Sequence, residues 1–352
     1  SGFHSSMKDY FVSGGEDISS LISRSSFQKG WGIYLDDLVI PSSAFKCSLC
    51  GQYPSTIVID GVCLGSRADL EATVPTRGST IIQCANPGWI LNKKTRKEIR
   101  EYGEGKGSMP MGLPYWIRQL LDAATLPTGF IDNRYRSLLN HWFSDSPVSD
   151  ILKVLDVDPH PDNVYGPIQS SQLDYFPLWD QKRGLAQYSK DKRQEEMECS
   201  RKVLGNNSNL SPGLLLFCCP HRICYGFQVL SSSEGPRALF RVFTTRFTPE
   251  TMPSTIIYDN GCHASAYVLS REPHLFKNTS FLIDRLHSAN HKTCARSLHL
   301  KEYDADPDMK SLNSQACEQY NALLRHVNHV LPFLRLNRFI KSVALFVSKN
   351  QK

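Results

Sequence analysis

No run of the sequence has the roughly 20 apolar residues that a membrane-spanning helix requires. The longest apolar run, residues 213–219, has the length of a buried strand. The chain begins at Ser1 without a methionine, and it lacks the basic, apolar and small-residue succession of a secretory signal. We therefore expect a soluble piece of a longer protein, with no membrane as a partner.

Several catalytic motifs are missing as well. The sequence contains no GxSxG nucleophile elbow, no HExxH zinc-protease motif and no P-loop string. It also lacks internal repeats and low-complexity tracts, and 41% of its 352 residues are hydrophobic, which is an ordinary globular proportion. These absences exclude fibrous and disordered classes, give no support to other hydrolase classes and predict no small-molecule cofactor.

The charge of the chain is only mildly positive, with a formal net value of +6 at pH 7. This charge permits binding to DNA but falls short of the strongly basic range of dedicated nucleic-acid modules. The eleven cysteines form an odd set, and several stand in CxxC pairs or beside histidines. Such usage favours metal binding in a reducing compartment, the nucleus or the cytosol, over a disulfide framework.

Changes of pattern along the chain predict three regions. Residues 1–45 form an N-terminal segment rich in polar residues, with one strand expected at residues 32–35. Residues 71–210 form a helical insertion, and residues 46–70 and 211–352 together form a core in which apolar, strand-sized runs recur. Within the insertion we expect helices at residues 113–123, 133–144 and 148–155.

The order of the predicted elements in the core matches the ribonuclease H-like fold. A first strand ends on Asp60, a hairpin of two strands follows the insertion, and after a helix another strand ends on Asp259. In that fold the first strand lies centrally, between the hairpin and the fourth strand. We therefore expect an α/β protein with a mixed sheet flanked by helices, in which the two aspartates stand side by side.

A third acid, Glu318, falls on a helix predicted at residues 314–330. Clustered carboxylates on rigid elements can hold two Mg²⁺ ions about 4 Å apart for phosphoryl transfer. Each acid alone has a simpler interpretation: the aspartates as turn residues that end a strand, and Glu318 as a solvated helix residue. Two acids at corresponding strand ends favour the metal site, in which water or a 3′-hydroxyl would be the nucleophile.

Four strings in the core resemble a known family. They are IDGVCLG at residues 59–65, YDNGC at 258–262, DRLHSANHKTC at 284–294 and NSQACEQYN at 313–321. Together they look like the Kyakuja-Dileera-Zisupton (KDZ) transposases and their host-derived relatives, over roughly residues 45–350. One such relative is the domesticated copy within a vertebrate HMG-box-containing protein.

The resemblance to the KDZ transposases implies a DDE catalytic domain with Asp60, Asp259 and Glu318 as its three acids. It also implies Mg²⁺ or Mn²⁺ as the cofactor, DNA as the partner, strand cleavage and transfer as the reaction, and the nucleus as the location. The competing hypothesis is a domesticated, catalytically silent DNA-binding or scaffold protein that keeps the fold, since fold alone does not determine activity. Assembly into a homo-oligomer stays open.

A first candidate zinc site begins with Cys47 and Cys50, because two thiolates at CxxC spacing reach one tetrahedral ion. Antiparallel pairing of the first two strands would bring partner ligands from the turn after the second strand. We favour Cys219 and His221 as those partners. Cys218 and Cys224 are alternatives, and free buried thiols are the simpler interpretation.

A second candidate zinc site combines two histidines and two cysteines near the predicted acids: Cys262, His287, His291 and Cys294. Such a closed set suits a structural zinc, which would fix the loop before the helix that carries Glu318. Alternatively the histidines are ordinary loop residues, or one of them contacts the scissile phosphate. Asp284 is a further candidate metal ligand.

Overall fold

A computed structural model describes most of the predicted core and short parts of the predicted insertion. The described residues are 23–38, 40–64, 81–82, 91–103, 105–111, 113, 187–188, 213–230, 234–328, 331–334 and 336–351.

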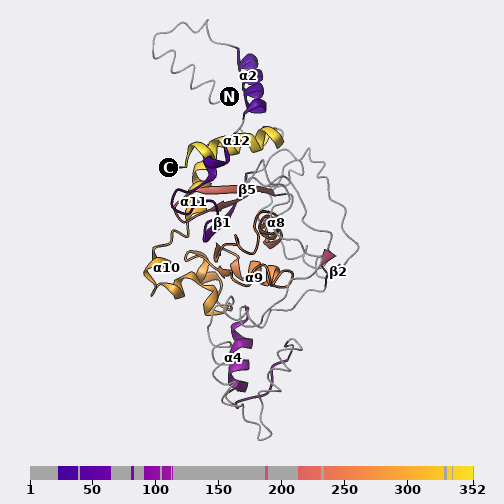
Figure 1. The fold of residues 1–352 in the computed structure, drawn as a ribbon, viewed down its shortest axis with the longest axis vertical. Helices are drawn as coiled ribbons and strands as arrows, with labels where there is room; N and C mark the ends of the chain where they lie inside the picture. Colours follow the sequence, from indigo (N-terminus) through magenta and orange to yellow (C-terminus); the bar gives the residue numbers. More distant parts are fainter. Residues whose placement is uncertain are drawn as a thin grey trace.

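A mixed five-stranded sheet forms the centre of the protein (Figure 1). Its strands are β1 (Thr56–Val62), β4 (Gly213–Cys218), β5 (Cys224–Leu230), β6 (Thr255–Tyr258) and β7 (Ser280–Leu282). They lie in the order β5-β4-β1-β6-β7. On one side β1 pairs antiparallel with β4, and on the other it pairs parallel with β6. As the order of the elements predicts, β1 is the central strand.

Both faces of the sheet are covered, which explains why its strands are almost continuously apolar. Along β1, Ile57 and Ile59 point into one hydrophobic cluster, while Val58 points into the other. Every residue of β4 and β6 is buried. Period-two alternation therefore sorts apolar side chains between two cores instead of between core and solvent.

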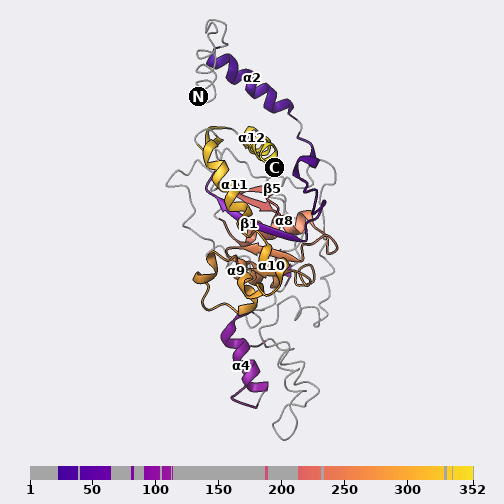
Figure 2. The ribbon, with the colours of Figure 1, turned by 90° about the vertical axis from the view of Figure 1, so that its left-hand side faces the viewer.

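Four helices supply the two covering layers (Figures 1 and 2). On one face lie α8 (Pro236–Arg246) and α9 (Gly261–Leu269), with α8 contributing the buried Phe243. On the other lie α11 (Ala316–Leu324) and α12 (Leu336–Lys349), whose Phe339, Val343 and Val347 recur at the four-residue spacing of one helix face. The sheet is thus a middle layer between helices, as the α/β expectation requires.

The remaining elements lie around this core. They are α2 (Arg24–Asp37), β2 (Ile81–Ile82), α4 (Lys93–Gly103), β3 (Gln187–Tyr188) and α10 (Pro307–Ser311). Beside α12 lies α2, and α4 projects at the opposite end of the molecule (Figures 1 and 2). The 3₁₀ helices span Ser42–Phe45, His287–Asn290, Arg296–Leu298, Leu300–Tyr303, Arg325–Val327 and Leu331–Phe333. Among the described residues, no helix is both long enough and apolar enough to cross a bilayer.

The prediction of a strand at residues 32–35 is wrong, because these residues belong to α2. The Ser23 side chain accepts a hydrogen bond from the Ser26 amide and caps this helix, which overrides the β propensity of Ile33 and Tyr34. In the predicted insertion, α4 is helical, and β2 pairs with β3 in a small parallel sheet that was not expected. The helices expected at 133–144 and 148–155, and that at 113–123 except Leu113, lie outside the described residues.

The close approach of β4 to β1 gives a test of the sheet centre. A Cβ atom on Gly213 would lie 2.1 Å from the Val62 carbonyl oxygen, whereas a Cβ on Gly30 in α2 would meet nothing within 4 Å. We expect Gly213→Ala to lower the free energy of unfolding by about 1–3 kcal/mol. Gly30→Ala, the matched control, should raise it by about 0.5–1 kcal/mol. Urea denaturation measures both, and equal effects would contradict the β1–β4 register.

Candidate functional site

Asp60 and Asp259 lie beside each other because their strands are parallel neighbours. Ile59 pairs with Tyr258 in the register of β1 and β6, and each aspartate is the next residue along its chain. Asp60 is buried and only 8% exposed. Parallel pairing therefore brings two carboxylates to the same edge of the sheet.

A small pocket opens over this edge. Asp60, Asp259 and Glu318 all line it, and so do Asp284 and His287. Glu318 comes from the first turn of α11, which packs against β1. The three acids expected from the sequence thus face one pocket.

A tight group of three carboxylates contains Glu234, which the sequence did not indicate. One carboxylate oxygen from each of Asp60, Glu234 and Asp259 lies within 4.8 Å of the other two. Glu234 lies two residues before α8 and is buried, with an exposed fraction of 5%. Glu318 lines the pocket but does not belong to this tight group.

Gly61 and Tyr258 explain how Glu234 reaches this position. A Cβ atom on Gly61 would lie 2.0 Å from Glu234 Oε2, so the carboxylate occupies space that only glycine leaves open. The Tyr258 hydroxyl donates a hydrogen bond to Glu234 Oε1 at 3.1 Å. Gly61, which follows Asp60, and Tyr258, which precedes Asp259, thus hold Glu234 in place.

The clustered carboxylates place negative charge around Tyr258. Burial, followed by the charges of Glu234, Asp259 and Asp60, raises the pKa of Tyr258 well above its ordinary value. Asp259 Oδ1 is buried and has no hydrogen-bond partner in the part of the chain that the structure describes. Asp60 Oδ2 accepts a hydrogen bond from Asn321 Nδ2 at 2.6 Å. One carboxylate is thus held by an amide, while its neighbour keeps an unpaired oxygen.

His287 belongs to the wall of this pocket. Its Nδ1 lies 2.6 Å from Asp284 Oδ2, and its backbone amide donates to Asp284 Oδ1 at 3.0 Å. Burial lowers the pKa of His287, but the bond and charge of Asp284, with the charges of Asp259 and Glu318, outweigh it and raise the pKa. The histidine therefore places a protonatable ring beside the acids.

His287 does not join the sulfur ligands with which it was grouped. Cys262, His291 and Cys294 come together, with His291 Nδ1 at 3.3 Å from Cys262 Sγ and 3.7 Å from Cys294 Sγ. The 3₁₀ turn that begins at His287 directs this side chain to Asp284 instead. The expected set of four is therefore corrected to three side chains among the described residues.

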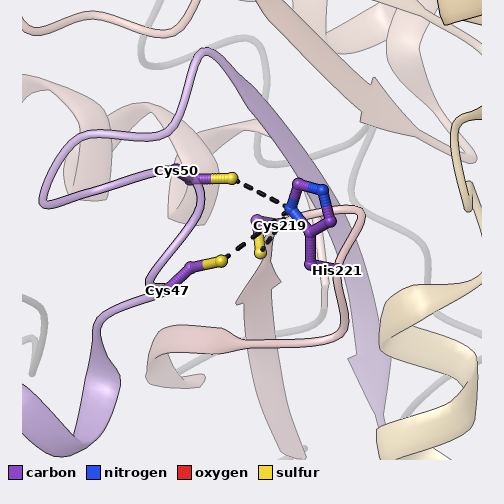
Figure 3. A group of neighbouring side chains, drawn as sticks. All are labelled: Cys47, Cys50, Cys219 and His221. Carbon is purple, nitrogen blue, oxygen red and sulfur yellow. Dashed lines mark hydrogen bonds between the residues drawn. The ribbon is translucent and has the colours of Figure 1, made fainter.

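The other expected group comes together in full. Cys47, Cys50, Cys219 and His221 place one ligand atom each within 4.8 Å of the others (Figure 3). Cys218 and Cys224, the alternatives, instead belong to the hydrophobic core under α11 and α12. These Cys and His groups could hold a metal ion such as zinc.

The buried amide of Asn321 gives a test of this geometry. Asn321→Asp would replace a hydrogen-bond donor to Asp60 with a second buried carboxylate, so we expect about 2 kcal/mol of destabilisation at pH 7. Burial and Asp60 would raise the pKa of the introduced group in the folded state, so the deficit should shrink as the pH falls toward about 4. Unfolding at both pH values measures this. The exposed Asn328→Asp is the control, and an equal loss at both pH values would contradict the contact.

Comparisons with known proteins do not identify a function for this chain, so a functional proposal has to rest on the site geometry and the sequence motifs. The resemblance to the KDZ transposases rests on the four strings, which contain Asp60, Asp259 and Glu318 together with four of the cysteines and histidines discussed above: Cys262, His287, His291 and Cys294. The chain matches no protein-family model, no curated protein and no solved structure.

Proposed function

We propose that the sheet belongs to the ribonuclease H-like class and carries a transposase-derived DDE nuclease and strand-transfer site of the KDZ kind. Numbered by their order in the chain, the strands of the main sheet lie as 3-2-1-4-5, with only the second antiparallel to the rest. Asp60 lies in the first strand and Asp259 follows the fourth, while Glu234 lies shortly before α8 on one face and Glu318 lies in the first turn of α11 on the other. This arrangement supports the fold assignment.

The observation that carries the proposal is the buried Oδ1 of Asp259, which has no hydrogen-bond partner among the described residues and lies within a group of three carboxylates. Negative charges this close repel one another, and a buried acceptor without a partner lowers stability. A divalent cation would relieve both, because Mg²⁺ and Mn²⁺ prefer carboxylate oxygens. The donor set therefore fits the metal that a DDE nuclease uses.

The residues in and beside the pocket would have different roles in phosphoryl transfer. Asp60 and Asp259 would hold the metal, with Glu234 and Glu318 completing the ligands from opposite faces of the sheet. When bound, Mg²⁺ would polarise the scissile phosphate and favour deprotonation of the attacking water or 3′-hydroxyl. Asn321 orients Asp60, and His287, held by Asp284, would place a proton and positive charge beside the DNA phosphate.

The Cys262, His291 and Cys294 group would support this pocket with a structural zinc ion. Cys262 lies in the first turn of α9, three residues after Asp259, and His291 lies four residues after His287. A metal here would therefore fix the His287 segment relative to Asp259. DNA as the substrate and the nucleus as the location follow from the same resemblance.

A second candidate function is a silent DNA-binding or scaffold protein that retains the acids for stability. Two hydrogen bonds favour it: Asn321 donates to Asp60, and Tyr258 donates to Glu234. Each bond gives a carboxylate a structural partner that requires no metal. Activity separates the two functions, because only the nuclease needs Asp259 for turnover.

The nuclease proposal is tested by nicking and strand transfer on supercoiled DNA with Mg²⁺ or Mn²⁺. Asp259→Asn should reduce the rate roughly 100-fold or more, because a neutral amide binds a divalent cation much more weakly than a carboxylate does. The exposed Asp308→Asn is the matched control and should keep the wild-type rate.

The same assay compares the cleavage rates of the two glutamate variants, Glu234→Gln and Glu318→Gln. We expect both variants to lose activity, because Glu234 belongs to the group of three carboxylates and Glu318 lines the pocket, so each would contact the proposed metal from a different element. Equal cleavage by wild type and Asp259→Asn would exclude this site as the source of activity. Absence of cleavage by the wild type would favour the scaffold.

A further inference from the structure

A second chemical centre lies away from the carboxylate pocket, where two separate turns meet. Cys47 and Cys50 belong to the turn before β1, and Cys219 and His221 belong to the turn between β4 and β5. Figure 3 shows the three sulfurs gathered around one side of the His221 ring, facing its Nδ1 atom. Cys47 and Cys219 are buried, while His221 is exposed and closes the group from the solvent side.

The distances in this group suit a tetrahedral metal. His221 Nδ1 lies 3.1 Å from Cys50 Sγ, 3.8 Å from Cys47 Sγ and 3.9 Å from Cys219 Sγ. A sulfur and a nitrogen bound to one tetrahedral zinc are about 3.6 Å apart, given the usual bond lengths. The three observed separations lie on both sides of this value, so small side-chain adjustments would suffice.

The backbone around the group is shaped for its four ligands. Gly51 adopts φ +73°, and its amide donates to the Cys47 carbonyl at 2.9 Å, which closes the first turn. In the second turn Arg222 adopts φ 65°, and its amide donates to the Cys219 carbonyl at 3.0 Å. Left-handed backbone at a non-glycine residue is unfavourable, so its presence here indicates a constraint on the turn.

Tyr225 of β5 holds the first turn by two hydrogen bonds. Its hydroxyl donates to the Gly51 carbonyl at 2.7 Å and accepts from the Cys47 amide at 3.3 Å. The first cysteine turn is therefore fixed on β5 by contacts that do not involve the sulfurs. Such preorganised ligands lower the conformational entropy lost when a metal binds.

We propose that Cys47, Cys50, Cys219 and His221 bind one structural zinc ion. This ion would join the turn before β1 to the β4–β5 turn, and we call this link the zinc clasp. Three thiolates and one imidazole form a closed set, which is the composition of structural zinc sites. The site is independent of the carboxylate pocket and of the nuclease proposal. Its function is to hold β1 in the sheet.

The clasp matters because β1 and β4 are far apart in the chain. Zinc joining Cys50 to Cys219 closes a loop of about 170 residues, which contains the whole predicted insertion. The strand pairing in which Asp60 lies opposite Leu216 must otherwise form across that loop. Zinc would therefore stabilise the central strand without contacting it.

Metal analysis of the full chain tests the clasp. We expect Cys50→Ser to contain about one zinc ion fewer per chain than the wild type. Cys63→Ser, at an exposed cysteine outside the group, should keep the wild-type content. Because the experiment measures zinc content, its result does not depend on whether the protein has nuclease activity. Equal zinc content in the wild type and Cys50→Ser would overturn the proposal.

A second variant answers the objection that Cys50→Ser might fail to fold. His221→Cys keeps four ligands, so we expect it to retain zinc, and its Co²⁺ form should show a stronger thiolate charge-transfer band than the wild type. In the wild type, zinc should also slow alkylation of Cys47 and Cys50 but leave Cys63 unchanged. Loss of zinc from His221→Cys together with equal alkylation with and without zinc would contradict the clasp.

Discussion

The parallel pairing of β1 with β6 is the constraint on which the rest of the site depends. It aligns Ile59 with Tyr258, and so it sets Asp60 and Asp259 side by side at one edge of the sheet. A shift of one residue would turn either aspartate to the opposite face. The two hydrophobic clusters oppose such a shift, because Ile57 and Val58 fill different cores. Packing on both faces thus fixes the position of the charges.

Close carboxylates are unfavourable unless something compensates for their charge, and the structure shows several local compensations. Asn321 donates to Asp60, Tyr258 donates to Glu234, and His287 lies near Asp259 and Glu318 with a raised pKa. These contacts leave Asp259 Oδ1 without a partner among the described residues. The proposed divalent cation would supply that partner and offset the remaining negative charge.

Local patterns predict the parts of this protein that depend on local chemistry. Apolar runs ending in Asp60 and Asp259 predict the two central strands, and the CxxC spacing predicts that Cys47 and Cys50 share a centre. Glu234 was missed because its position depends on space above Gly61, which only the folded chain shows. His287 was misplaced because a short turn, not its spacing from His291, decides its direction. Residues 32–35 were misassigned because capping overrides β propensity.

The central claim, that the carboxylates form a metal centre, is tested most directly by crystals of the full chain grown with Mn²⁺. The account predicts anomalous density between Asp60 and Asp259, within reach of Glu234 or Glu318. Density at that position lost in an Asp259→Asn crystal would establish the ligand set. The same fold with no density there at saturating Mn²⁺, and with Asn321 still bonded to Asp60, would contradict the claim.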